Sequence, residues 1–372
     1  MSESGRLAVI AAGGTGGHLF PAQALAEALT ARGWRIALAT DLRTESLSKD
    51  FPAERRFAIP SATLAGGPAA RAGQVRAIGR GVLQARAALK GLKPRVVVGF
   101  GGYPSIPTLI AARLLGLKTV IHEQNAVMGR ANRLLAPQVT AVACAFPILM
   151  KARASVKRRA QVVGNPVRPA IRALAGQGYA PPGVGGPIHL FVTGGSQGAR
   201  VLSEIVPAAA SALPADLRAR LKVVQQARPE TLEAAAAVYR QAGVEAELAA
   251  FFSDMPLRWT WAHLVVSRAG ASTVSEIAVA GRPAILVPLG VALDDDQGQN
   301  ARLLSEAGAA RVVRETDLTV DGLAATLAEL FADPACLAHL AAAAAAAATP
   351  DAAERLADLV ESTVGAIEGA SS

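Results

Sequence analysis

The chain has 372 residues, of which 51% are hydrophobic and 4% aromatic, and its formal net charge is +9. This length exceeds a single core, so two domains are expected, and the shortage of aromatic rings argues against a protein that stacks nucleic-acid bases. Two cysteines, Cys144 and Cys336, exclude a disulfide framework and favour a reducing cytosol, and short, interrupted apolar runs predict neither a signal peptide nor a transmembrane helix.

The basic and acidic residues are divided unevenly along the chain. Residues 1–203 hold 26 basic and 7 acidic residues, a net charge of +19, whereas residues 204–372 hold 12 and 22, a net charge of −10. Between Arg55 and Ser203 the single acidic residue is Glu123. We therefore expect the first half to face a polyanion such as nucleic acid, anionic lipid or a phosphorylated substrate. A solvated basic surface without a partner is the alternative.

Residues 7–29 predict an apolar strand, a glycine loop and a helix. The loop, Gly13-Gly14-Thr15-Gly16-Gly17, ends in His18. Glycines let a ligand approach the backbone, and the N–H groups at the start of a helix favour an anion, so phosphate is the expected ligand. The loop is not a strict dinucleotide fingerprint, since Leu19 replaces the third glycine, and it is not a Walker A motif. A tight turn without a ligand is the alternative.

Residues 75–93 predict an amphipathic helix. Its apolar face holds Val75, Ile78, Val82 and Leu89, and its basic flanks hold Arg76, Arg80, Arg86, Lys90 and Lys93. This arrangement is typical of a helix that lies in the interface of an anionic membrane. Gly79 and Gly81 weaken the helix, so a packed helix with a basic outer face is the alternative.

Two further strand ends carry polar residues of the kind found in binding sites. Residues 96–112 run from an apolar strand into a glycine turn that contains Tyr103 and Ser105, and a later strand ends in HEQN (122–125). Ligands bind at the carboxyl ends of parallel strands, so we expect these side chains to point into a cleft rather than into the core. Glu123 has either a functional role or a nearby arginine as its partner.

The second half of the chain begins like the first. Residues 188–200 again run from an apolar strand into a glycine loop, Gly194-Gly195-Ser196-Gln197-Gly198, and the prolines and glycine of residues 162–169 mark a seam between the halves. We therefore predict two Rossmann-like, doubly wound α/β domains, residues 1–163 and 164–372, whose glycine loops open into one cleft. The last helix is a candidate to return to the first domain.

Residues 263–288 predict a strand, a short loop and a helix. Thr273 to Glu276 fits a capping box, in which Glu276 bonds back to the first N–H of the helix. The alternative is that Glu276 accepts both hydroxyls of a ribose. Three adjacent aspartates follow at 294–296, but consecutive acids on a regular element do not converge on one ion, so no metal site is expected.

Seven motifs occur in order between residue 7 and about residue 310. They are GGTGGH (13–18), GFGGYPS (99–105), HEQN (122–125), GNPVR (164–168), GGSQGA (194–199), SRAGASTVSE (267–276) and Q-x-x-N-A (297–301). In this order they closely resemble the MurG family, the bacterial enzymes that transfer N-acetylglucosamine in peptidoglycan synthesis. The resemblance implies a GT-B fold, with an N-terminal domain for the acceptor and the membrane and a C-terminal domain for the UDP-sugar.

The activity that the resemblance implies is an inverting transfer of N-acetylglucosamine. The donor is UDP-N-acetylglucosamine, and the acceptor is the 4-hydroxyl of the muramyl sugar in undecaprenyl-linked lipid I, which becomes lipid II. The resemblance places this reaction at the cytoplasmic face of the bacterial inner membrane, on an anionic surface. It implies roles in cell wall biogenesis, cell shape and cell division, within a cell-wall synthesis complex. It implies no cofactor, no metal and no nucleic acid.

The resemblance also assigns the site residues by position. The donor sugar and diphosphate fall to Thr15, Gly16, Gly17, Asn125, Arg168 and Ser196, and the nucleotide falls to Phe252, Ala271, Ser272, Thr273, Val274, Ser275 and Glu276. In the second group the backbone of Phe252 reads uracil and Glu276 holds the ribose. Gln297 reads the sugar hydroxyls, although Asp296 stands where the family often has another glutamine.

His18 is the candidate catalytic residue. Inversion requires that the acceptor hydroxyl lose its proton as it attacks the anomeric carbon, and an imidazole with an ordinary pKa of about 6.5 is a suitable base at neutral pH. A hydrogen bond to the acceptor phosphate or to another loop is the alternative role. Arg168, Ser196 and helix N-termini would stabilise the departing UDP without a metal.

The main alternative function is that of a UDP-N-acetylglucosamine 2-epimerase-like enzyme, because such enzymes share the fold and the donor. They need no lipid acceptor, so the apolar and basic helix and the paired glycine loops argue against this function. A non-catalytic nucleic-acid binder and an NAD-dependent oxidoreductase fit less well, because aromatic residues are few and the dinucleotide fingerprint is incomplete.

Overall fold

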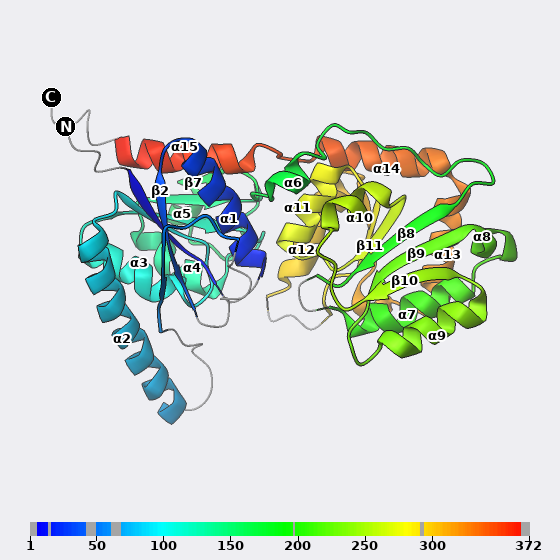
Figure 1. Ribbon diagram of the computed structural model, residues 1–372, viewed down its shortest axis with the longest axis horizontal. Helices are drawn as coiled ribbons and strands as arrows, with labels where there is room; N and C mark the ends of the chain where they lie inside the picture. The colour runs from blue at the N-terminus through cyan, green and yellow to red at the C-terminus, as the bar shows by residue number, and fades with distance from the viewer. Residues whose placement is uncertain are drawn as a thin grey trace. The chain divides into compact units, whose positions relative to one another are not determined.

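The computed structural model describes residues 6–13, 16–41, 50–60, 68–195, 198–290 and 294–365. The chain forms two compact units, Met1–Arg168 with Pro350–Ser372, and Pro169–Thr349. Figure 1 shows that each unit is a sheet flanked by helices. The first unit extends beyond the predicted boundary at residue 163 and ends within the seam, at Arg168, because the carbonyl of Gly164 accepts a hydrogen bond from His122 and Arg168 contacts the ring of Phe20.

The sheet of the first unit has seven parallel strands in the order β3-β2-β1-β4-β5-β6-β7. The strands are β1 (Leu7–Ala11), β2 (Arg35–Thr40), β3 (Arg55–Ala58), β4 (Val96–Gly99), β5 (Lys118–Glu123), β6 (Ala141–Cys144) and β7 (Ala160–Val162). The chain runs outward in one direction from β1 to β3 and in the other from β4 to β7. The switch point therefore lies between β1 and β4, and ligands bind at the carboxyl edge of such a point.

Helices cover both faces of this sheet. They are α1 (Gly16–Ala31), α2 (Pro68–Leu92), α3 (Ser105–Leu114), α4 (Arg130–Leu135), α5 (Ala154–Lys157) and α15 (Ala352–Gly365), with the 3₁₀ helix η3 (Ala136–Gln138). The apolar side chains of α1 and α15 pack on one face, and those of α2, α3 and α4 pack on the other. Most of these side chains are alanine, valine, leucine and isoleucine, which accounts for the low aromatic content of the sequence.

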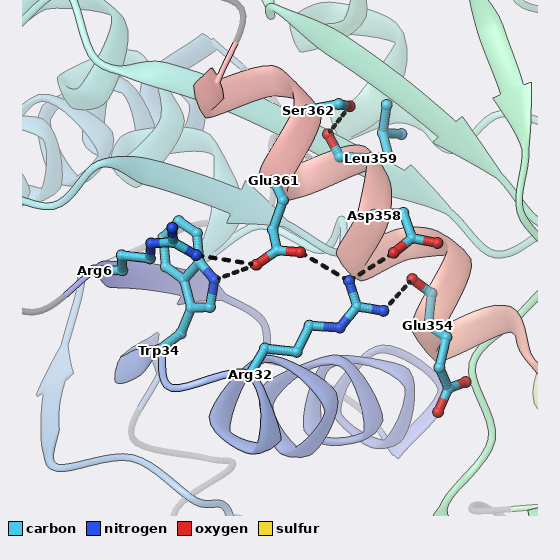
Figure 2. Close-up of polar contacts among 8 residues, drawn as sticks. All are labelled: Arg6, Arg32, Trp34, Glu354, Asp358, Leu359, Glu361 and Ser362. Atoms are coloured by element: carbon cyan, nitrogen blue, oxygen red, sulfur yellow. Dashed lines mark hydrogen bonds and ion pairs between the residues drawn. The ribbon is translucent and has the colours of Figure 1, made fainter. Parts of the chain in front are cut away.

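The last helix, α15, is held against the end of α1 by polar contacts, which Figure 2 shows. Nη1 of Arg32 donates to Asp358 at 2.6 Å and to Glu361 at 2.9 Å. The indole N–H of Trp34 donates to the other carboxylate oxygen of Glu361, also at 2.9 Å. The hydrogen bond from Trp34, followed by that from Arg32, holds the pKa of Glu361 below its ordinary value against the opposing effect of burial.

Replacing Glu361 with glutamine is expected to lower the free energy of unfolding by about 1 kcal/mol at neutral pH, because a partly exposed, charge-assisted contact is lost. Folding lowers the pKa of this carboxyl, so its stabilisation is complete above the ordinary glutamate pKa and is lost as the pH falls through the lowered value. Urea unfolding at neutral and acidic pH measures both effects. Glu329→Gln, which removes an exposed pair with Arg311, is the matched control; equal losses in the two variants would contradict the prediction.

The sheet of the second unit has six parallel strands in the order β10-β9-β8-β11-β12-β13, with its switch point between β8 and β11. The strands are β8 (Ile188–Thr193), β9 (Leu221–Gln226), β10 (Glu245–Ala249), β11 (Leu264–Ser267), β12 (Ala284–Leu286) and β13 (Ala310–Val312). The two sheets confirm the predicted pair of Rossmann-like, doubly wound α/β domains. Each glycine loop follows the first strand of its own sheet, and the single cleft between the loops stays a prediction.

Ten helical elements accompany the second sheet in the part of the chain that the structure describes. They are α6 (Pro169–Arg172), α7 (Arg200–Ser211), α8 (Ala215–Arg220), α9 (Leu232–Ala242), α10 (Met255–Trp261), α11 (Ala271–Ala280), α12 (Asp296–Glu306), η4 (Glu315–Asp317), α13 (Val320–Ala332) and α14 (Pro334–Ala346). Among the described residues no single helix is long and apolar enough to span a membrane. Helices α13 and α14 have the required length and apolarity only when they are taken together, and the pair is bent by 95°.

The prediction that the apolar face of α2 lies in a membrane interface is wrong. Leu89 is buried, and Ile78 and Val82 pack against the same core cluster as the strands. Val75 alone of the four apolar residues is largely exposed. The helix is therefore the packed alternative with a basic outer side. The core cluster with α3 and the sheet removes Ile78, Val82 and Leu89 from water, so these side chains do not need a membrane to cover them.

Candidate active site

Gly13, which follows β1, and the turn after β4 meet at the carboxyl edge of the first sheet, beside its switch point. Gly102 has a left-handed φ of +70°, and a Cβ there would lie 3.0 Å from the carbonyl oxygen of Gly13 and 3.4 Å from Cδ2 of His18. Glycine therefore lets the turn pack on the loop and on the imidazole together. Ser105, at the start of α3, holds the turn in place by donating to the carbonyl oxygen of Ala11 at 2.9 Å.

A chain of polar side chains leads from His18 into the interior of the first unit. Nδ1 of His18 lies 2.9 Å from Oε1 of Gln124, and Nε2 of Gln124 lies 3.0 Å from Nδ1 of His122. On the far side of its ring, Nε2 of His122 lies 2.9 Å from the carbonyl oxygen of Gly164. Burial lowers the pKa of His122 to about 4, so this ring is neutral at neutral pH.

The single acid of the basic stretch, Glu123, holds the loop between β5 and α4. One oxygen accepts from the backbone N–H of Asn125 at 3.0 Å and from its side-chain amide at 3.4 Å. The other accepts from the backbone N–H of Gly129 at 2.9 Å and from the side chain of Asn132 at 2.8 Å. A carboxylate that accepts four amide hydrogen bonds is satisfied without an arginine, so the predicted arginine partner is not needed.

The expectation that the HEQN side chains point into a cleft is wrong for three of the four. His122, Glu123 and Gln124 are 0%, 2% and 1% exposed, and only Asn125 is half-buried. The loop that follows β5 folds back over the end of the strand, so these polar groups pair with one another and with the loop backbone. Gln124 is hydrogen-bonded to His18, and this half-buried imidazole connects the buried polar groups to the surface.

Arg168 and the first turn of α1 form a second part of this edge. The guanidinium carbon of Arg168 lies 4.4 Å from the centre of the Phe20 ring, in a cation–π contact. Gly16 makes room for this ring, because a Cβ at Gly16 would lie 2.9 Å from it. The start of the helix, Gly17 and Arg168 therefore belong to one edge of the first unit, whereas Thr15 lies outside the described residues.

The second glycine loop is held by a glutamine that the sequence analysis did not single out. Oε1 of Gln226, at the end of β9, accepts from the backbone N–H of Gly194 at 3.0 Å and from the Thr193 hydroxyl at 2.9 Å. Its Nε2 donates to the carbonyl oxygens of Gly195 and Ala250, each at 3.1 Å. Two adjacent glutamines at the end of an apolar strand were the available signal. Ser196 lies outside the described residues.

Phe252 follows Ala250 and is anchored through its ring. Its ring lies edge-on to Phe191 at 6.1 Å, and the Arg258 guanidinium stacks on it at 4.7 Å. Among the described residues none hydrogen-bonds to the backbone N–H or C=O of Phe252. The backbone N–H and C=O of Phe252 can therefore bind a planar ligand, such as a base, that offers one hydrogen-bond acceptor and one donor.

The capping-box interpretation of Thr273 and Glu276 is wrong. Helix α11 begins at Ala271 with Gly270 as its N-cap, so Glu276 lies in the second turn, beyond reach of the first N–H. Its carboxylate is buried and accepts from the indole N–H of Trp259 at 3.1 Å. Trp259 is fully buried and lies edge-on to the ring of Phe191, so it fixes the orientation of the carboxylate. No local pattern in the sequence indicates that Trp259 is the partner of Glu276, because the two residues lie on different helices.

The other predicted nucleotide residues occupy the first turns of α11. Ala271 and Val274 are buried, whereas Ser272, Thr273 and Ser275 are half-buried. The hydroxyl of Ser275 donates back to the carbonyl of Ala271 at 2.9 Å. The Ser272 hydroxyl oxygen is buried without a partner among the described residues, which is the state of a side chain that a ligand can complete.

Gln297 lies in the first turn of α12, where it ties the preceding loop to the helix. Its Oε1 accepts from the backbone N–H of Leu289 at 3.1 Å. Asn300, one turn further on and fully buried, donates to the carbonyl of Ala269 at 3.2 Å, so α12 is held beside the start of α11. Asp295, the N-cap, accepts from Gln299 at 3.3 Å. All of these residues belong to the carboxyl edge of the second sheet.

The matches with known proteins cover both units. Residues 8–144 match the glycosyltransferase family 28 N-terminal domain, and residues 189–356 match its C-terminal domain. A protein of Phenylobacterium zucineum is 62% identical over 96% of this chain and 98% of its own length; it is named UDP-N-acetylglucosamine–N-acetylmuramyl-(pentapeptide) pyrophosphoryl-undecaprenol N-acetylglucosamine transferase. The crystal structure of Acinetobacter baumannii MurG has a TM-score of 0.77 and 31% identity, over 96% of this chain and 99% of that one.

A solved UDP-N-acetylglucosamine 2-epimerase shares the fold alone, with a TM-score of 0.63 and 13% identity over 94% of both chains. Two doubly wound sheets that each carry a glycine loop at the carboxyl edge, together with the family 28 domains, define a glycosyltransferase with the GT-B fold. Within that class the relatives match almost from end to end. The chain belongs to the MurG family.

Proposed function

We propose that this chain transfers N-acetylglucosamine from UDP-N-acetylglucosamine to the muramyl 4-hydroxyl of undecaprenyl-linked lipid I, giving lipid II with inversion at the anomeric carbon. The observation that carries the proposal is the 62% identity to the Phenylobacterium zucineum transferase over nearly the full length of both chains. The test is transfer of labelled N-acetylglucosamine to a lipid I analogue. An epimerase would instead form UDP-N-acetylmannosamine from the donor alone, and that product would overturn the proposal.

In this proposal the second unit binds the nucleotide. The backbone of Phe252 reads uracil, Glu276 accepts the ribose hydroxyls, and the first turns of α11, including Ser272, contact the nucleotide. Gln297 reads the hydroxyls of the donor sugar from the start of α12. The glycine loops and the starts of α1 and α7 supply N–H groups to the diphosphate, because free N–H groups and the helix dipole favour an anion at a helix start. Support comes from the carboxylate that Trp259 holds in place and from the buried hydroxyl of Ser272, which has no partner among the described residues.

Glu276→Gln is expected to weaken binding of UDP-N-acetylglucosamine about tenfold to hundredfold, because a ribose hydroxyl bonds more strongly to a charged acceptor than to an amide. The amide keeps the size of the side chain and one oxygen for Trp259, so folding is expected to survive. Isothermal titration with UDP measures the change. Glu306→Gln, an exposed residue of α12 paired with Arg302, is the control; unchanged UDP affinity in the first variant would remove Glu276 from the ribose site.

The outward side of α2 and α3 is the proposed membrane surface of the first unit. It carries Arg76, Arg80, Arg86, Lys90 and Arg113, all exposed, together with exposed Leu83 and Leu114. The leucines are 68% and 64% exposed, so each can enter a lipid headgroup layer. No acidic residue lies between Glu54 and Glu123 in the sequence, so the basic charge of these helices is not offset along the chain. An anionic lipid surface is the partner that this combination favours.

Arg80→Glu with Lys90→Glu is expected to reduce flotation with anionic vesicles at least about tenfold, because each basic residue near such a surface contributes about 1 kcal/mol. The binding that remains should weaken further as salt is added. Arg220→Glu with Arg240→Glu makes the same change of charge on the second unit and should leave flotation almost unchanged. If both double variants float equally, charge on α2 does not direct membrane binding.

A further inference from the structure

The direction of each hydrogen bond in the chain from His18 to Gly164 follows from the chemistry of its members. A carbonyl oxygen only accepts, so Nε2 of His122 carries a hydrogen and donates to Gly164 at 2.9 Å. His122 is fully buried and neutral, so its ring has one N–H and its Nδ1 is an acceptor. Gly164 has a φ of +87°, a conformation that favours glycine.

The amide of Gln124 can take only one orientation beside His122. Its Nε2 lies 3.0 Å from Nδ1 and 3.1 Å from the carbonyl oxygen of His122, and both of these atoms are acceptors. The two amide hydrogens are therefore both used, and Oε1 faces outward to His18. Turning the amide over would place its oxygen against the carbonyl oxygen of His122, and this repulsion excludes the other orientation.

His18 receives the end of this chain. Oε1 of Gln124 is an acceptor, so Nδ1 of His18, at 2.9 Å, carries the hydrogen. A neutral imidazole has one N–H, so its Nε2 is left with a free electron pair. This is the tautomer that a base needs if Nε2 takes the proton of the acceptor.

We propose that Gln124 and His122 are positioning residues that keep the hydrogen of His18 on Nδ1 and leave Nε2 as the basic atom. The inference rests on the proposed function of His18. In the reaction Nε2 takes the proton of the 4-hydroxyl, and the oxygen forms its bond to the anomeric carbon. The bond from that carbon to UDP breaks, and UDP leaves with the electron pair. The imidazolium keeps its Nδ1–H on Gln124 throughout, so no rearrangement accompanies the step.

The tautomer can be observed without any substrate. The chain has five histidines, so ¹⁵N-labelled histidine gives a sparse spectrum in which His18→Asn identifies the His18 signals. In the full chain His18 is expected to show its proton on Nδ1, and His122 to show it on Nε2. A proton on Nε2 of His18 in the unmodified protein would overturn the inference, even if His18→Asn is inactive and the proposed base role stands.

Variants of Gln124 test the consequence for the reaction. Gln124→Met should lower kcat about tenfold to hundredfold, a part of what a general base contributes, and leave KM for UDP-N-acetylglucosamine within about twofold. Gln124→Glu keeps an acceptor for Nδ1–H, although its second oxygen faces the carbonyl oxygen of His122 and is repelled by it, so it should retain more activity than the methionine variant but less than the unmodified enzyme. Its acid limb should move to higher pH, because a carboxylate beside the ring favours the protonated form.

The control is Gln225→Met, which removes another fully buried amide, one that bonds to Tyr239 and Leu202 in the second unit. It should leave the His18 signals and kcat unchanged. A structural role of Gln124 alone predicts equal losses in its Met and Glu variants and no shift of the pH profile, and that result would overturn the inference. If the tautomer is as proposed but His18→Asn remains active, the base role fails and the hydrogen-bond chain stands.

Discussion

His18→Asn is expected to lower turnover with a lipid I analogue by about a hundredfold or more, because general base catalysis typically contributes that much. Asparagine keeps a donor and an acceptor close to the position of Nδ1, so it can still bond to Gln124 or to a phosphate. It cannot take a proton from the acceptor hydroxyl. The substitution therefore separates the proposed base role from a binding role, which the sequence leaves open.

The measurement is the rate of transfer of labelled N-acetylglucosamine, with UDP affinity measured in parallel. UDP affinity should not change, since in this proposal the imidazole of His18 acts on the acceptor hydroxyl and not on the nucleotide. His339→Asn, on the exposed side of α14, makes the same substitution away from either carboxyl edge and should be neutral. Turnover within a few-fold of the unmodified enzyme would end the base assignment and favour the phosphate contact.

The sequence predicted the fold because its signals are local. The first strand of each half is short and apolar and runs into a glycine loop, at 13–17 and again at 194–198, so two doubly wound domains follow directly. The family could also be predicted from the sequence, since several of its motifs lie in these loops. The α/β class and the glycosyltransferase family are both confirmed.

The sequence predicted the site less well, because burial and partners are decided by segments far apart in the chain. Glu276 has the spacing of a capping box, yet the helix starts at Ala271, and the indole N–H of Trp259 on α10 donates a hydrogen bond to the Glu276 carboxylate. The apolar stripe of α2 has the same pattern whether it faces lipid or a sheet, and only contacts with α3 distinguish the two. Gln124 reads as one more polar residue at a strand end until His18 is placed against it.

Arg168→Ala is expected to lower kcat about a hundredfold to a thousandfold, as the loss of a fixed donor to a developing negative charge does in other enzymes. The guanidinium of Arg168 lies over the ring of Phe20, which places this cation beside α1. An anion at that helix start would meet both the guanidinium and the helix N–H groups. We therefore expect Arg168 to act on the diphosphate as it leaves.

Arg168→Lys distinguishes charge from geometry. Lysine keeps the positive charge but has neither the planar face that stacks on Phe20 nor the paired donors, so its kcat should fall between those of the alanine variant and the unmodified enzyme. Arg172→Ala, four residues on and exposed, is the matched control and should stay within about twofold. UDP affinity by calorimetry decides the assignment. A loss of affinity in Arg168→Ala places the guanidinium at the phosphates, whereas unchanged affinity with lowered kcat confines its contact to the transition state, and unchanged affinity and kcat together remove it from the site.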